Sequence, residues 1–181
     1  IWHPGPQKFN VSLFDVDTPE STEKIEELNV DGYVISSRRV DNKLLVVSSY
    51  SPVIEGLIYF PQNDEDKKKN FELIKNLDVS TLLPKYTDAA GVEQNLVSAD
   101  DCFIPTDATN KDGYDSIVTL TTINLDNPSE INSVCINSSM LGIYATPESV
   151  YVYGSKDNKE SVIHKFGLNN MSFDYQASTD F

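Results

Sequence analysis

An internal repeat constrains the fold of this chain more than any other feature of its sequence. One turn signature spans residues 14–19 and recurs at residues 123–128: an apolar residue, Asp or Asn, an apolar residue, Asp, a polar residue and Pro. A degraded third copy lies at residues 166–170. Asp and Asn side chains accept hydrogen bonds from the backbone two residues on, and Pro cannot continue a strand. Each copy therefore predicts the end of a strand and a change in chain direction.

The segments that follow the turns also match. Each of the two clear copies is followed by three strand-like runs, with a tight turn at Asp41-Asn42 in the first copy and at Pro147-Glu148 in the second. Both residue pairs favour short hairpins. The runs are residues 24–30, 32–39, 43–50, 130–137, 141–146 and 149–154. We interpret the repeat as strand, Asx-Pro turn, strand, strand, hairpin, strand.

The repeat length indicates the architecture. The chain advances 43 residues from Asp126 to Asn169, and a four-stranded unit of about 40–45 residues is typical of a β-propeller blade. The continuous apolar runs at residues 44–47 and 150–153 predict strands that are covered on both faces, as in a blade packed between two neighbours. A β-sandwich is the alternative that the same strands allow.

The first repeat is longer than the second, since 109 residues separate Asp17 from Asp126. We assign the excess, residues 51–113, to an inter-strand insertion. It is expected to be partly helical, because acids at 64–66 meet lysines at 67–69 at helical spacing. Phe71, Ile74 and Leu77 are expected to pack inward from this helix.

We predict an all-β fold in which residues 1–50 and 114–181 form blades of one incomplete propeller domain. It should hold about two four-stranded antiparallel blades with flanking strands. The strand at 9–16 is assigned to a preceding blade, the strands at 24–50 and 117–125 to one full blade, and residues 130–168 to the next. Residues 171–177 would open a third blade. Since a closed ring usually needs four to eight blades, we expect this chain to be a fragment of a larger propeller.

These residues resemble the secreted β-propeller domain family of bacteria and archaea, which is distantly similar to the WD-repeat propellers. The resemblance covers most of the chain and rests on four segments: residues 31–38 (DGYVISSR), 78–84 (DVSTLLP), 143–152 and 163–166 (IHKF). It implies an exported or membrane-anchored protein of unassigned biochemical function. It implies no catalytic residue.

The chain is strongly acidic, with 14 basic and 28 acidic residues among 181, a formal charge of −14. This charge argues against nucleic acid as a partner. We find no stretch of the roughly 20 apolar residues that a transmembrane helix needs.

The candidate site residues are few. Cys102 and Cys135 are the only cysteines, which excludes a four-cysteine metal site but leaves open whether they form a disulfide or are two small buried side chains. His164 shares a strand face with apolar neighbours and is interpreted as a packed or edge-strand histidine. Arg38 is interpreted as an inter-blade ion-pair or hydrogen-bond anchor, with an anion contact near the propeller channel as the alternative.

An acidic segment ahead of Tyr114 contains the weak calcium candidates Asp107, Asp112 and Asp115. Calcium prefers such oxygen ligands, but a lysine and a valine stand where an EF-hand loop needs ligands. We therefore interpret the segment as a solvated acidic loop and expect no cofactor, with calcium as the alternative.

These observations predict a non-enzymatic binding or scaffolding domain that is secreted, periplasmic or displayed at the cell surface. Its expected partners are the remaining blades of the same propeller and a protein or carbohydrate ligand. The alternative is part of a secreted propeller enzyme, a hydrolase or lyase whose catalytic residues lie in blades outside this chain.

Overall fold

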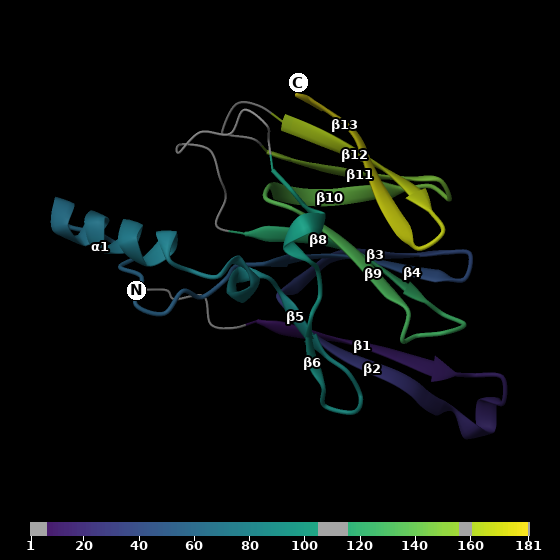
Figure 1. The fold of residues 1–181 in the computed structure, drawn as a ribbon. Coiled ribbons are helices and arrows are strands. Elements are labelled where there is room, and N and C mark those ends of the chain that lie inside the picture. Colours follow the sequence, from purple (N-terminus) through teal and green to yellow (C-terminus); the bar gives the residue numbers. More distant parts are fainter. Residues whose placement is uncertain (1–6, 105–115, 156–160, 181) are drawn as a thin grey trace.

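The computed structural model describes residues 7–104, 116–155 and 161–180, in which nearly all strands pair antiparallel in three sheets (Figure 1). We call these sheets A, B and C. Sheet B lies between the other two (Figure 1). The all-β class and the arrangement in blade-like sheets, both predicted from the sequence, are confirmed.

Sheet A contains two long strands and two short ones. Its strand order is β1 (Lys8–Asp15), β2 (Glu23–Asp31), β5 (Lys85–Thr87) and β6 (Glu93–Asn95). A short 3-10 turn, Pro19–Ser21, lies between β1 and β2.

Sheet B has five strands. Its order is β3 (Tyr33–Val40), β4 (Lys43–Tyr50), β8 (Ile117–Asn124), β9 (Ile131–Ile136) and β7 (Cys102–Phe103). The two-residue strand β7 is the exception to the antiparallel pairing, because it runs parallel to β9.

Sheet C has four strands in chain order. They are β10 (Ser139–Ala145), β11 (Ser149–Ser155), β12 (Ser161–Asn169) and β13 (Ser172–Asp180).

Two apolar cores hold the sheets together. The larger core lies between sheets B and C, because the inward residues of β4, β8 and β9 meet those of β10 to β13. Leu45, Leu120 and Phe166 are fully buried there. The smaller core lies between sheets A and B and is centred on Leu28 and Ile123. Sheet B is thus covered on both faces, as its continuous apolar run predicts.

The assignment of strands to blades needs a correction. We expected the strand that begins near Lys24 to share a sheet with the next two strands, but β2 pairs with β1 in sheet A. The Asx-Pro turns therefore join neighbouring strands of one sheet, β1 to β2 and β8 to β9. The chain instead changes sheet at Gly32, because a single residue between β2 and β3 is too short for a hairpin turn.

The last strand also needs a correction. Residues 171–177 were expected to open a third blade, but β13 pairs with β12 along its length and completes sheet C. Sheet C thus contains β10 to β13, one strand later than the blade that we assigned to residues 130–168.

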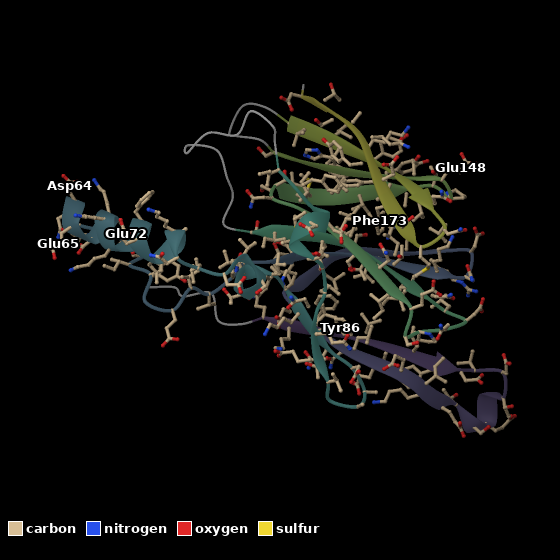
Figure 2. The ribbon with its side chains drawn as sticks, viewed as in Figure 1. Asp64, Glu65, Glu72, Tyr86, Glu148 and Phe173 are labelled. Atoms are coloured by element: carbon tan, nitrogen blue, oxygen red, sulfur yellow. A yellow bond between two sulfur atoms is a disulfide. The ribbon has the colours of Figure 1, made fainter. Side chains whose placement is uncertain are left out.

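The described part of the insertion contains a helix and three short strands. Helix α1 (Asp64–Lys75) begins where the Asn63 side chain accepts a hydrogen bond from the Asp66 amide, an N-cap. Two 3-10 turns, Val79–Leu82 and Ala99–Asp101, follow it. The helix lies away from the sheets, with Asp64, Glu65 and Glu72 on its surface (Figure 2).

The predicted packing is wrong for Phe71 and Ile74, whereas Leu77, just after the helix, is half-buried. Phe71 is 63% exposed and Ile74 is 49% exposed, and α1 has no buried residue. The helical spacing of charges predicted the element correctly, but it carried no information on whether a second surface covers the apolar side chains.

Candidate functional site

Arg38 lies on β3 with an exposed side chain. Its Nη1 donates a hydrogen bond to the Ser37 carbonyl oxygen at 2.7 Å, which is a contact within its own strand. No ion pair of Arg38 is found among the residues that the structure describes. The inter-blade role and the anion contact both stay predictions.

His164 is a packed residue on β12, which lies between β11 and β13 in sheet C. Its Nδ1 lies 3.2 Å from the Tyr175 hydroxyl oxygen. Burial lowers the pKa of His164, and the carboxylate of Asp180 opposes that shift. The Tyr175 ring in turn contacts the rings of Phe103 and Phe166, with centroids 5.1 and 5.2 Å away. The imidazole is therefore part of an aromatic cluster rather than of an open cleft.

The question that the sequence left open for the two cysteines has an answer in the structure. Cys102 on β7 and Cys135 on β9 form a disulfide, with their Cα atoms 4.4 Å apart. They are direct partners in the parallel pairing of the two strands. Cys135 is 2% exposed, whereas Cys102 is only partly buried.

The three calcium candidates, Asp107, Asp112 and Asp115, lie outside the described residues. Within the described ranges no group of three or more His, Cys, Asp or Glu side chains is arranged to hold a metal ion. Calcium binding at the acidic loop stays a prediction.

The outward face of sheet C is the most distinctive exposed surface of the described chain. Leu141 is 71% exposed, Tyr144 is 64% exposed and Tyr153 is 45% exposed. Alternate residues of β11, including Val150 and Val152, point into the core with sheet B, so the tyrosines between them point outward.

The tyrosines of this face are held by cross-strand contacts. Tyr144 and Tyr151 are direct partners on β10 and β11, with ring centroids 6.1 Å apart. The Nζ of Lys165 lies 5.9 Å from the centroid of the Tyr151 ring, a cation-π distance.

Tyr153 lies over a glycine. A Cβ built on Gly142 would come within 2.4 Å of the Tyr153 hydroxyl oxygen. The absence of a side chain at Gly142 thus lets the phenol ring lie against the backbone of β10.

The outward face of sheet A is different, because its cross-strand pairs are polar. Asn10 faces Asn29, Asn29 faces Thr87, and Thr87 faces Glu93. Two ion pairs lie on the same sheet: Lys8 Nζ with Asp31 Oδ1 at 2.9 Å, and Lys85 Nζ with Glu93 Oε1 at 2.8 Å. The hydrogen bond from Lys85 lowers the pKa of Glu93. Such a face is compatible with water.

An open hollow of about 570 Å³ lies where the chain passes from sheet A to sheet B. It is lined by residues 7–9 and 32–34. The one ionic side chain in this lining, Lys8, is already paired with Asp31. Apart from Lys8, the hollow therefore offers neutral side chains, both apolar and polar.

Sequence reasoning did not single out the tyrosine face of sheet C. The sequence does contain a signal for this face: Tyr144 lies in one strand, and Tyr151 and Tyr153 occupy alternate positions in the next. We had interpreted the run at 150–153 as covered on both faces, and in this chain sheet B covers one of them.

The described residues contain no helix that is long and apolar enough to cross a membrane.

Comparisons with known proteins bear on the fold. No curated protein and no solved structure matches the chain. A family model described as "Beta propeller domain" matches residues 3–180, and its extent agrees with the three blade-like sheets. The chain therefore belongs to the β-propeller domain family.

Proposed function

We propose that this chain is a non-enzymatic binding and scaffolding part of an exported β-propeller, and that the outward face of sheet C is its docking surface. The observation that carries the proposal is the exposure of Leu141, Tyr144 and Tyr153 on the same sheet. Exposed apolar groups gathered on one surface mark interaction sites.

The chemistry of the face indicates the kind of partner. Its centre is aromatic and aliphatic, with Lys165 held over Tyr151. A second sheet with an apolar face, such as a further blade, complements it. The polar outward face of sheet A does not, because its ion pairs and amides would lose water without gaining partners.

The disulfide supports the exported location. Disulfides form and persist in oxidising compartments outside the cytosol. The charge of −14 supports it less directly, since it favours solubility and disfavours contact with nucleic acid.

The docking surface can be tested with the purified chain, in which a second copy supplies an apolar sheet. We expect sedimentation velocity to show association that rises with concentration at physiological ionic strength. The double variant Leu141→Lys/Tyr144→Lys should abolish it. The matched control Asn10→Lys/Ser12→Lys adds the same charge to sheet A and should leave association unchanged. A chain that stays monomeric at every concentration, or an equal loss in the control, would contradict the docking surface.

The non-enzymatic part needs a separate test. The chain and its sheet C variant should be assayed against ester, peptide and glycoside substrates, with and without added divalent metals. We expect no turnover above the buffer background. Turnover that is lost on substitution of residues in sheet B or C would overturn this part of the proposal and place catalytic residues in the sheets of this chain.

A further inference from the structure

The insertion connects two sheets through their edges. Strand β5 pairs with β2 of sheet A, and β7 pairs with β9 of sheet B. Both β2 and β9 directly follow an Asx-Pro turn, so they are equivalent strands of the repeat. The insertion thus extends two successive sheets at corresponding edges, by β5 and β6 next to β2 and by β7 next to β9.

The attachment to sheet B is small and is centred on the disulfide and on the Phe103 ring, which borders the larger core and stacks on Tyr175. Strand β7 contains two residues, and its pairing is limited to Cys102 with Cys135 and Phe103 with Ile136. A minor core surrounds the disulfide, with Leu83 and Val97 of the insertion packed on Cys135. One further backbone hydrogen bond joins the Asn137 amide to the Phe103 carbonyl oxygen at 3.3 Å.

A buried hydroxyl lies next to the disulfide and lacks a hydrogen-bond partner in the described part of the chain. Thr119 on β8 is the direct cross-strand partner of Cys135, and it is 1% exposed. Its Oγ1 has no hydrogen-bond partner among the described residues. Side chains of direct partners lie within about 5.5 Å at Cβ, and a disulfide sulfur carries no proton to donate. A Cys135 thiol could donate to Thr119 or accept from it.

We propose that the Cys102–Cys135 disulfide is a redox-sensitive latch that holds residues 97–104 on sheet B. In the oxidised chain the latch is closed and β7 covers the edge of β9. In the reduced chain the Cys135 thiol stays packed beside Thr119, while β7 and the adjoining 3-10 turn leave the sheet. The three sheets themselves stay folded, because the buried residues of their two cores lie outside residues 97–104, and Phe103 only borders the larger core.

The chemical step is thiol–disulfide exchange with a dithiol. One thiolate of the dithiol attacks the sulfur of Cys102, which is the partly exposed one, and the Cys135 sulfur leaves as a thiolate. The second thiol of the reagent then displaces Cys102 and closes its own disulfide. Two electrons pass from the dithiol to the protein, and each cysteine gains one proton. Closing the latch is the reverse reaction with a small-molecule disulfide.

The latch can be tested on the intact chain by hydrogen exchange measured by mass spectrometry. One sample is kept oxidised and a second is reduced with dithiothreitol. We expect residues 97–104 and the Asn137 amide to lose protection by at least about tenfold on reduction. Peptides from β4, β11 and β12 should be unchanged. Loss of protection throughout the chain would overturn the proposal in favour of a disulfide that the whole fold requires. No change anywhere would overturn it as well.

Two variants separate the roles of the cysteines and of Thr119. Cys102→Ala/Cys135→Ala should show the open pattern without reductant and no response to dithiothreitol. A closed pattern in this variant would show that packing alone holds β7. Thr119→Val removes the hydroxyl and should make the disulfide harder to reduce by glutathione, by about three- to tenfold in the equilibrium constant. An unchanged equilibrium constant for reduction would show that Thr119 does not contribute to the latch.

Discussion

Single residues decide where the chain can pass from one sheet to the next. Gly32 has φ of 99°, and a Cβ at this position would lie 2.2 Å from the Ser49 carbonyl oxygen. Both the backbone conformation and the contact with β4 exclude a side chain. We predict that Gly32→Ala lowers the free energy of unfolding by about 3 kcal/mol or more, measured by urea denaturation with circular dichroism.

Gly91 is the matched control for this substitution. Its φ is 81°, which is also positive, but a Cβ there would meet no atom within 4 Å. Gly91→Ala should therefore cost only the conformational penalty, about 1–2 kcal/mol. Equal losses in the two variants would mean that the close approach to Ser49 contributes nothing.

The buried imidazole of His164 links stability to pH. Because burial lowers the pKa of His164 in the folded chain, the unfolded chain binds more protons as the pH falls below about 6.5. Stability should therefore be highest above that value and should decline between about pH 7 and pH 5.5. The carboxylate of Asp180 moderates the effect.

His164→Gln isolates this effect, because glutamine can still contact Tyr175 but does not titrate. The slope of unfolding free energy against pH should be smaller in the variant than in the parent chain over this interval. Urea denaturation at a series of pH values provides the comparison. Identical slopes would assign the pH dependence to other groups.

At the scale of strands, β8 and β9 are joined by a buried hydroxyl pair. Thr121 Oγ1 and Ser133 Oγ lie 2.9 Å apart, and both residues are buried. Thr121→Val or Ser133→Ala alone leaves one hydroxyl without its partner, which we expect to cost about 1–3 kcal/mol.

The double variant should be less destabilised than the sum of the single variants, because no unpaired hydroxyl remains. A double-mutant cycle from urea denaturation measures this coupling. Strict additivity would show that the hydrogen bond does not couple the two strands.

The strands themselves could be predicted from the sequence, but their sheet membership could not be predicted in full. Apolar runs and turn residues located the strands of sheets B and C, because both signals are local. Which strands pair depends on whether the segment that links two strands is long enough to form a hairpin turn. The one-residue link at Gly32 was such a signal: it is too short for a hairpin, so it separates sheets.

The candidate sites, like the sheets, could be predicted only as far as local sequence signals reach. Pairing of Cys102 with Cys135 depends on β7 lying beside β9, a contact between segments 33 residues apart that no local pattern encodes. The tyrosines of sheet C were visible as residues but not as an exposed face, because exposure depends on what lies against the sheet. The acids at 107–115 remain a sequence prediction.

At the scale of the whole molecule, the excess of acidic residues opposes compaction. Five ion pairs are found among the described residues, and most of their side chains are substantially exposed. Exposed pairs contribute about 0–1 kcal/mol each. The repulsion within a chain of charge −14 should therefore outweigh them.

We accordingly predict that added salt stabilises the folded chain. Raising NaCl from about 0.01 M to about 0.3 M shortens the screening length from about 30 Å to less than 8 Å, which weakens repulsion across the molecule more than attraction within contact pairs. The midpoint of thermal unfolding should rise by several degrees. An equal osmolality of glucose serves as the control and should not reproduce the rise. A midpoint that falls with NaCl would mean that local ion pairs, rather than the net charge, dominate the electrostatics of this fold.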